Sequence, residues 1–498
     1  MRRWIHCNLS IQPWLRAWTP HTGIQRSPSE SGPESSLEKD VVMTGNLVAG
    51  PKLWSRRKAT KLLDPLPTTF EAPQDEAPRA FDFDVAIVGM GYVGLPTSLA
   101  FSAAGARVLG VDVSSDRLDV IRSGRADLVD SDRERLTRAL TDPSFELTSD
   151  PTRLSRAAAV IICVPTPVDA YLVPDLRILD SACQAVVEQA VSGQLILLTS
   201  TTYVGSTRHL LATPLAKRGL IAGSNIHVAF SPERINPGTE SFAHEDVPRV
   251  VGGITNSCTA AAEALIGTYT RLIHVVSSAD AAEMTKLVEN TFRAVNIGLA
   301  NEFADMANSL KLDVMEVINA AATKPYGFMA FTPGPGVGGH CIPCDPHYLL
   351  WQMRRLRLST PVIEQAMNAI AARPGRVVDR IRKILSDSDR GLHSARVLVV
   401  GVAYKPDVED LRESPALEII GSLLEEGTVV GYHDHLIPTL RLDDGTVLEH
   451  NQDPGGFEAD LVLLHTAHSN TDTSWISPEV SVLDSTFRLP HGANILHL

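Results

Sequence analysis

Residues 83–103 read FDVAIVGMGYVGLPTSLAFSA, and this stretch decides the fold. A short apolar run ends at Val88, glycines follow at Gly89, Gly91 and Gly94, and a helix-forming run comes after them. In such a strand–turn–helix unit the first glycine permits the tight turn, the second lets a pyrophosphate approach the backbone, and the third lets helix and strand pack closely. The pattern predicts a dinucleotide site with its phosphates at the helix N-terminus.

Asp112 supplies the second half of this pattern. It follows the next expected strand, 107–111, and lies 23 residues after Gly89. A carboxylate at this place can bind both ribose hydroxyls and repel a 2′-phosphate, so NAD is favoured over NADP. Arg117 is a nearby cation that could accept such a phosphate, face the pyrophosphate or face solvent. A glycine turn without a nucleotide is the alternative interpretation.

Strands and helices alternate after this unit. The pattern predicts strands near 158–163, 194–199 and 226–229, and helices near 175–190 and 205–217. Such alternation is typical of a parallel sheet that helices cover on both faces. We therefore expect a doubly wound, Rossmann-like α/β domain at 81–276.

A helical segment comes next. Ser277 or Ser278 can cap a long helix that begins near Asp280, and residues 281–322 contain few helix breakers. Helical patterns resume at about 345–385. The sequence thus predicts a central helical domain at 277–390.

A second α/β unit begins at 396. Its strand at 397–400 precedes a loop, and Ser414-Pro415 starts the following helix, because serine is favoured at the N-cap and proline at the first helical position. More strands are expected near Val429 and Leu461. These elements predict a second Rossmann-like domain with a parallel sheet at 391–498.

Composition narrows the classes of partner. The chain carries 45 Lys and Arg against 58 Asp and Glu, a net charge of −13, which disfavours binding to nucleic acid or to an anionic membrane surface. No apolar run reaches the roughly 18 residues that a transmembrane helix needs. Six cysteines in 498 residues favour a reducing compartment, so the cytoplasm is expected.

Residues 1–80 differ from the rest of the chain. They hold nine of the 32 prolines and four of the six tryptophans, with no sustained helical or strand period. A disordered extension is the expected structure. The first 29 residues lack a continuous apolar segment, so a secretory signal is not expected.

The loop at 334–347 reads GPGVGGHCIPCDPH and allows three interpretations. Cys341 and Cys344 could form a redox pair, or His340, Cys341, Cys344 and His347 could bind zinc. The third interpretation is a single nucleophile, Cys341, which a bulky substrate reaches past the glycines, and no metal is expected in that case. Neighbouring cations, or a helix that starts at Asp345, could lower the pKa of its thiol.

Lys286, Asn290 and Arg293 are spaced to share one face of the long central helix. A solvated polar face is the ordinary interpretation of such a stripe. The apolar flanks Leu287, Val288, Phe292 and Val295 instead predict a largely buried helix, in which the polar stripe needs partners.

Seven motifs in a fixed order resemble the nucleotide-sugar dehydrogenase family, which includes UDP-glucose and GDP-mannose 6-dehydrogenases. They are GMGYVG at 89–94, VPTP at 164–167, STT at 200–202, SPER at 231–234, KLVEN at 286–290, GPGVGGHCIP at 334–343, and YKPD at 404–407 with RESP at 412–415. The resemblance covers the chain from about residue 83 to its C-terminus.

Within that family the chain looks most like the UDP-N-acetylglucosamine 6-dehydrogenase branch, on KPYGF at 324–328 and GGHCIP at 338–343. Glucose-type enzymes usually carry a lysine where this chain has Cys344, and an acidic residue where it has Pro237. UDP-glucose and GDP-mannose are therefore the alternative substrates, and Cys344 is expected to be a spare buried thiol.

The resemblance implies a four-electron oxidation of a sugar C6 alcohol to a carboxylate with two NAD. Cys341 would add to the aldehyde, and the resulting thiohemiacetal would become a thioester that water cleaves. Lys286 and Asn290 would stabilise the oxyanion, while Asp345 would organise the attacking water and the Lys286 proton. Glu233 is the expected general base, and Thr201 would orient water or substrate.

Binding residues follow from the same resemblance. NAD would bind Gly89, Gly91, Tyr92, Val93, Gly94, Asp112, Arg117, Pro165, Thr166 and Thr201. A UDP-sugar would bind Glu233, Arg234, Lys286, Asn290, Lys324, Gly336, Gly338, Gly339 and Lys405, with its nucleotide against the domain at 391–498. Arg412 would bind substrate or form a structural ion pair. The central domain at 277–390 would form a homodimer or a higher homo-oligomer.

Two other classes of function stay open. A two-electron 3-hydroxyacid-type dehydrogenase has a similar three-part layout, but it would yield one NADH and would not need Cys341. A nonenzymatic, NAD-binding sensor of zinc or redox state would instead use the cysteine pair.

Overall fold

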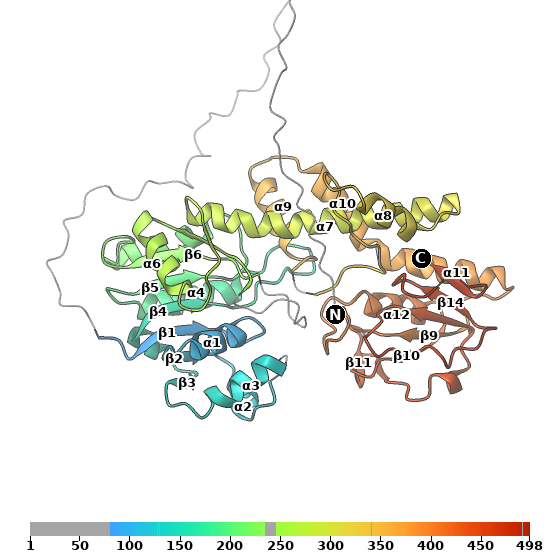
Figure 1. Ribbon diagram of the computed structural model, residues 1–498, viewed down its shortest axis with the longest axis horizontal. Helices are drawn as coiled ribbons and strands as arrows, with labels where there is room; N and C mark the ends of the chain where they lie inside the picture. Colours follow the sequence, from blue (N-terminus) through green and yellow to red (C-terminus); the bar gives the residue numbers. More distant parts are fainter. Residues whose placement is uncertain (1–79, 127, 129, 235–245, 340, 491) are drawn as a thin grey trace, which may run out of the picture. The chain divides into compact units, whose positions relative to one another are not determined.

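A computed structural model describes residues 80–498, apart from 127, 129, 235–245, 340 and 491 (Figure 1). The extension expected at 1–80 falls outside this part of the chain except for its last residue, so its disorder stays a prediction. Within the described residues, no helix is both long and apolar enough to cross a membrane.

The first sheet has eight strands in the order β3-β2-β1-β4-β5-β6-β7-β8. They are β1 (Phe83–Val88), β2 (Val108–Val111), β3 (Phe145–Thr148), β4 (Ala157–Ile162), β5 (Leu195–Leu198), β6 (His227–Phe230), β7 (Arg249–Gly253) and β8 (Ile273–Val275). The strands from β3 to β6 are parallel, as a Rossmann-like domain requires. Strand β7 runs antiparallel to β6 and parallel to β8, so the sheet is parallel apart from the β6–β7 pair.

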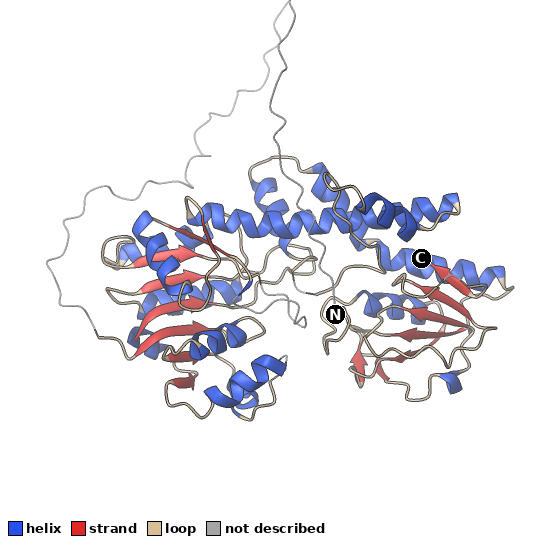
Figure 2. Cartoon of the chain, viewed as in Figure 1, coloured by secondary structure: helices blue, strands red, loops and turns tan. Residues whose placement is uncertain are grey.

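Helices cover both faces of this sheet because alternate strand residues point to opposite sides (Figure 2). Ala86 of β1 packs with one apolar cluster, whereas its neighbours Val85 and Ile87 pack with the other. The covering helices are α1 (Gly94–Ala103), α2 (Ser115–Arg122), α3 (Asp130–Ala139), α4 (Arg177–Gln189), α5 (Thr213–Lys217) and α6 (Asn256–Ile266), with a π-helical turn at Thr207–Ala212.

The central segment is helical, as expected. Helix α7 (Ala279–Leu310) is 32 residues long, starts at a Ser278 cap that accepts the N–H of Ala281, and ends at Lys311 in a left-handed conformation. It is followed by α8 (Val314–Ala322), α9 (Asp345–Arg355), α10 (Pro361–Ala371) and α11 (Arg373–Asp387).

One face of α7 departs from the sequence expectation. Leu287 is fully buried, but Val288 and Phe292 are 47% and 49% exposed. The prediction of a largely buried helix is therefore wrong for this face of α7. Apolar residues in a sequence do not distinguish a core from a surface that another molecule covers.

The second sheet has five parallel strands in the order β10-β9-β13-β14-β15. They are β9 (Arg396–Val400), β10 (Val429–His433), β13 (Leu461–Leu464), β14 (Ser481–Asp484) and β15 (Ile495–His497). Helix α12 (Pro415–Glu425) starts at the expected Ser414 cap, and a small hairpin joins β11 (Thr439–Arg441) to β12 (Val447–Glu449). Two Rossmann-like α/β domains with a helical region between them in the sequence confirm the expected fold class.

Candidate active site

The glycine loop after β1 has the geometry that its sequence predicts. Gly89 has a φ of +93°, and a Cβ on it would lie 2.6 Å from the Cys163 carbonyl oxygen. A Cβ on Gly94 would lie 1.8 Å from the Gly89 oxygen, so only glycine lets α1 start here. A Cβ on Gly91 would meet nothing within 4 Å, which leaves open space for a pyrophosphate.

Asp112 is held against this loop at the end of β2. Its Oδ2 accepts the Met90 N–H at 2.7 Å, and its Oδ1 accepts the Ser114 N–H at 2.9 Å. Arg117 donates from Nε to the Met90 carbonyl at 2.8 Å. The arginine is therefore tied to the glycine loop, and the half-buried carboxylate is oriented beside it. These residues fit NAD, with the carboxylate on the ribose and the helix N-terminus on the phosphates.

Asp112→Asn is expected to lower kcat/KM for NAD by about 10-fold to 100-fold, because a hydrogen bond to a charged group is lost. It should also narrow the preference for NAD over NADP, since the charge that repels a 2′-phosphate is gone. Initial rates with each cofactor measure both effects. Asp116→Asn removes the same charge from an exposed site on α2 and serves as the control. Unchanged NAD kinetics in Asp112→Asn would contradict the assignment.

The polar stripe of α7 lies against the loop at 334–347, here called the cysteine loop, where that loop leads into α9. Asn290 donates to the Asp345 carboxylate, and the Asp345 N–H donates to the Cys341 carbonyl at 2.8 Å. Lys286 donates from Nζ to the backbone oxygen of Glu233 at 2.7 Å. Five of the residues predicted for catalysis thus come from three separate segments into one cluster.

The ionisable groups of this cluster are strongly perturbed. Burial raises the pKa of Asp345 to about 6, although Lys286 and the Asn290 hydrogen bond oppose this shift. The pKa of Cys341 is also raised, first by desolvation and then by Asp345, even though the residue reaches solvent. Burial and the carboxylate thus outweigh the cations that could have lowered the pKa of this thiol.

Cations gather around the thiol from several elements. Lys286, Arg293 and Arg412 each favour the Cys341 thiolate electrostatically. Burial and then Arg293 lower the pKa of Lys405, so these two cations lie close to each other. A chain of net charge −13 thus concentrates positive charge where an anionic ligand could bind.

Arg412 has a structural role in this arrangement. It forms an ion pair with Asp410 at 2.6 Å, and its guanidinium lies over the Tyr92 ring at 4.3 Å from the centroid. Of the two expectations for Arg412, the ion pair is confirmed. Tyr92 belongs to the glycine loop, so the arginine also joins that loop to the segment after β9.

Glu233 has a partner that the sequence did not reveal. Its two carboxylate oxygens accept from Nη1 and Nη2 of Arg249 at 2.6 and 3.0 Å, and Oε1 also accepts the Arg234 N–H at 2.7 Å. Arg249 is 2% exposed and stands at the start of β7. In the sequence, the only hint of this ion pair was an arginine at the edge of an apolar run. Both carboxylate oxygens of Glu233 are therefore already engaged by hydrogen-bond donors.

The glycines before Cys341 are required by packing. A Cβ on Gly336 would lie 2.6 Å from Pro415, and one on Gly338 would lie 2.6 Å from the Glu413 oxygen. A Cβ on Gly339 would lie 2.7 Å from the Tyr404 ring. The segment between β9 and α12 therefore lies directly against the cysteine loop.

The remaining predicted residues lie in different settings. Ser200 accepts the Val164 N–H at 2.9 Å and donates to its carbonyl at 2.8 Å, so the loops that hold Thr201 and Pro165 are joined. Thr166 is buried, and its carbonyl accepts the Tyr348 hydroxyl at 3.2 Å.

Arg234 is bound by Glu289. Lys324 lies in an exposed segment, with its ammonium 5.0 Å from the Tyr326 ring centroid.

The zinc and redox interpretations gain no support here. Residues 80–498, without the gaps named above, contain no group of three or more His, Cys, Asp or Glu that could hold a metal ion. His340 lies outside the described residues. Cys344 is 4% exposed, and burial raises the pKa of its thiol to about 12.

Three family models match the chain in succession. The description of each begins with the UDP-glucose/GDP-mannose dehydrogenase family, and they represent its NAD binding domain at residues 83–272, its central domain at 280–369 and its UDP binding domain at 398–485. Together they cover most of the described residues, in the order that the sequence motifs predicted.

Similar proteins agree with this match. The chain is 33% identical over 403 residues to an NDP-N-acetyl-D-galactosaminuronic acid dehydrogenase of Ralstonia nicotianae, covering 78% of this chain and 92% of the relative. It is 34% identical over 352 residues to a UDP-N-acetyl-D-mannosamine dehydrogenase of Yersinia pestis, covering 68% and 82%.

Solved structures show the same likeness. A UDP-N-acetylmannosamine dehydrogenase from Pyrococcus horikoshii matches with a TM-score of 0.74 and 28% identity, covering 83% of this chain and 98% of that one. The chain therefore belongs to the UDP-glucose/GDP-mannose dehydrogenase family and is an NAD-dependent nucleotide-sugar dehydrogenase.

Proposed function

We propose that the chain oxidises the C6 alcohol of a UDP-N-acetylhexosamine to a carboxylate, with UDP-N-acetylglucosamine as the first candidate. The observation that carries this proposal is the cluster of Cys341, Lys286, Asn290 and Asp345. The KPYGF segment and Cys344 support an acetamido sugar over glucose. Relatives named for N-acetylgalactosaminuronic acid and N-acetylmannosamine support the same sugar class. The product would serve polysaccharide synthesis.

The reaction consumes one alcohol, two NAD and one water, and it yields one carboxylate, two NADH and three protons. NAD, when bound at the glycine loop, accepts a hydride at each oxidation. The Cys341 thiolate adds to the aldehyde carbon and forms a thiohemiacetal, because an aldehyde cannot release a second hydride to give an acid until a nucleophile has added. Loss of that hydride leaves a thioester, and water then releases the carboxylate and the thiol.

Lys286 and Asn290 supply the oxyanion stabilisation in this proposal. Both are on the same face of α7, and an ammonium and an amide donor placed there need no rearrangement as negative charge develops. The bond from Lys286 to the Glu233 carbonyl uses one of its three hydrogens and fixes its direction.

Asp345 is the proton acceptor that the geometry favours. Its pKa of about 6 is close to neutral, as an effective general base requires. Glu233, which sequence reasoning placed in this role, is better suited to orienting the substrate, because Arg249 holds both of its carboxylate oxygens.

Charge supports the proposed place of the nucleotide. Arg293 interacts electrostatically with both Lys405 and Cys341, so it lies near each of them, and a diphosphate would offset the repulsion between the two cations. We place the uracil and the diphosphate against the domain at 391–498, with Gly336, Gly338 and Gly339 beside the sugar.

A panel of nucleotide sugars tests the proposal. UDP-N-acetylglucosamine, its galacto and manno epimers, UDP-glucose and GDP-mannose are each incubated with NAD, and NADH is counted against uronate. We expect two NADH per uronate, with an acetamido sugar preferred. One NADH per product would favour the two-electron alternative, and a preference for UDP-glucose or GDP-mannose would overturn the substrate class.

The cysteines of the described residues form no disulfide, which supports the cytoplasm as the proposed compartment.

We also propose that α7 pairs with a second copy of the chain. Its exposed apolar residues form a stripe of helical spacing, namely Met284, Val288, Phe292, Leu299, Phe303, Met306 and Leu310. These residues are 38% to 69% exposed, which is unfavourable for a long helix without a partner. A second α7 has the same length and the same apolar stripe, so it can cover this face.

The double substitution Phe292→Glu and Phe303→Glu is expected to convert dimers or larger oligomers to monomers, because four charges would be buried per pair of helices. Light scattering after size exclusion measures the mass. Val362→Glu, at an exposed valine of α10, is the control and should leave assembly unchanged. A wild-type protein that is monomeric at micromolar concentration would contradict the pairing.

A further inference from the structure

Asp434 stands in the second α/β domain where Asp112 stands in the first. Asp112 follows β2, which pairs with β1, and it binds the backbone of the loop after β1. Asp434 follows β10, which pairs with β9, and it binds the backbone of the loop after β9. Asp434 Oδ2 accepts the N–H groups of Val402 and Ala403 at 2.7 and 3.1 Å, and its Oδ1 accepts the Leu436 N–H at 3.0 Å. The two domains therefore use the same carboxylate position to fix a loop.

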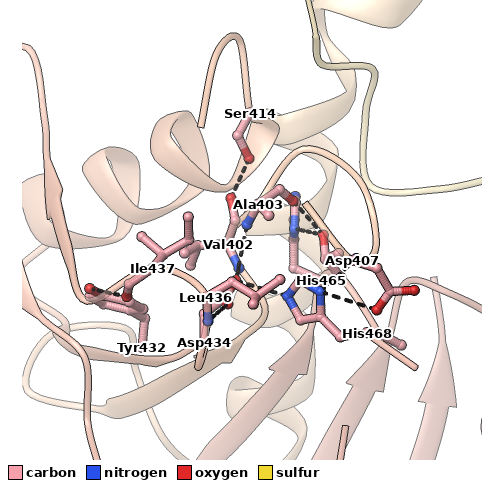
Figure 3. A network of polar contacts seen from close by, with 12 residues as sticks. Val402, Ala403, Asp407, Ser414, Tyr432, Asp434, Leu436, Ile437, His465 and His468 are labelled. Carbon is pink, nitrogen blue, oxygen red and sulfur yellow. Dashed lines mark hydrogen bonds and ion pairs between the residues drawn. The ribbon is translucent and has the colours of Figure 1, made fainter. Parts of the chain in front are cut away.

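The two carboxylates differ in what covers them. Asp112 is half-buried, whereas Asp434 is 1% exposed and has the His468 ring against it, with Nε2 at 3.1 Å from Oδ2 (Figure 3). Burial alone would raise the pKa of Asp434, but hydrogen bonds from His468 and the two loop N–H groups lower it to about 2. This carboxylate cannot reach a ribose, and it serves the loop instead.

His468 joins two parts of the loop through opposite ring nitrogens. Its Nδ1 accepts the Asp407 N–H at 2.9 Å, so its Nε2 carries the hydrogen that it donates to Asp434. Asp407 has a φ of +61°, a left-handed conformation that is uncommon in proteins but that aspartate adopts more often than most residues. Ser469 holds the Asp407 side chain, donating from N at 2.8 Å and from Oγ at 2.5 Å.

The fixed segment 402–407 carries Tyr404, which lies against the cysteine loop, and Lys405, which interacts electrostatically with Arg293. Tyr404 packs on Gly338 and Gly339, just before the catalytic cysteine of the proposed mechanism. Lys405 is the cation paired in space with Arg293. A shift of this segment would therefore move both a wall of the cysteine loop and a phosphate-binding cation.

We propose that Asp434 and His468 are positioning residues for the UDP part of the substrate. They hold the backbone of 402–407 so that Lys405 and Tyr404 are placed before the ligand arrives, which reduces the ordering cost of binding. Neither residue touches the substrate, and the inference rests on the proposed function.

Calorimetric titration with UDP tests this inference, together with steady-state kinetics on the nucleotide sugar. In His468→Ala we expect Kd for UDP and KM for the sugar nucleotide to rise about tenfold, the effect of losing hydrogen bonds to a loop and a charged group. KM for NAD should change less than about twofold and kcat less than about threefold. His468→Asn keeps an acceptor near the position of Nδ1 for the Asp407 N–H, and His468→Gln keeps a donor near the position of Nε2. Each of these variants should therefore lose less UDP affinity than the alanine variant does.

His497→Ala is the matched control, because His497 also lies beside a buried aspartate of the second domain, Asp484, at 3.6 Å. It should leave UDP affinity unchanged. Equal UDP affinity in wild type and the three His468 variants would overturn the inference. An equal weakening of NAD binding and UDP binding would overturn it as well. If the alanine variant does not fold, the asparagine and glutamine variants decide. A wild-type protein that does not bind UDP would overturn the proposed function, and this inference with it.

Discussion

Cys341→Ser is expected to reduce uronate formation by roughly 10⁴-fold or more, as the loss of a catalytic nucleophile does in other enzymes. A serine hydroxyl is far less acidic than a thiol, so it would need a stronger base to become a nucleophile, and an ester would replace the thioester. The first hydride transfer does not need the sulfur. One NADH per active site can therefore form before the variant stalls at the aldehyde, and rapid-mixing absorbance at the NADH band measures that amplitude.

Cys344→Ala is the control for this experiment. Cys344 is 4% exposed and its thiol pKa is raised to about 12, so it should contribute packing and no chemistry. We expect turnover within about twofold of wild type and a stability loss on the order of 1 kcal/mol for the small cavity. An equal loss of activity in both variants would contradict a single nucleophile and would favour a paired-thiol function.

Asp345→Asn is expected to lower kcat by about 10²-fold to 10³-fold, because it removes the proposed proton acceptor from beside Cys341 and Lys286. The Asp345 pKa of about 6 also predicts a pH effect in the wild type. The carboxylate predominates above that pH and is protonated below it, so kcat should fall as the pH drops through about 6. The variant has no carboxyl group there, and its residual rate should lack this dependence.

The same substitution should stabilise the fold near neutral pH. The pKa of Asp345 is raised from 3.8 to about 6, so the folded protein holds this proton more tightly than the unfolded chain does. Stability is therefore lost as the pH rises from about 4 through 6, and above that the buried charge costs on the order of 2 to 3 kcal/mol. Asparagine avoids this cost, so Tm should rise by several degrees at pH 7.5 and little at pH 4.

Asp379→Asn provides the control, since Asp379 is an exposed carboxylate on α11. It should change neither kcat nor Tm measurably. A variant of Asp345 with full activity would contradict its role as proton acceptor. A Tm that falls at neutral pH would show that the hydrogen bond from Asn290 matters more than the buried charge.

Local chemistry explains why so much of the fold could be predicted. Gly94 is required by a clash with Gly89 inside one strand–turn–helix unit, and Gly89 itself has a positive φ there. Ser278 and Ser414 mark helix starts by hydrogen bonds that span two or three residues. Such signals depend on neighbours in the sequence alone. Short strands such as β14 carry weaker signals and were not foreseen.

Distant contacts explain what could not be predicted. Arg249 reaches Glu233 from another strand, and His468 reaches Asp434 across 34 residues. The exposure of Phe292 depends on what covers α7, which a pattern of apolar residues does not reveal. The burial expected for the apolar face of α7 is corrected by these contacts, whereas the role expected for Glu233 stays a prediction.

The sequence by itself determined the two α/β folds and the choice of NAD, because both depend on residue type and short-range spacing, whereas the role of Cys341 as nucleophile stays a prediction. Only the tertiary structure decided how acidic the groups around Cys341 are and which carboxylates are already occupied by partners. A pKa sums burial and charge over every element that packs around a group, and those elements meet only when the chain is folded.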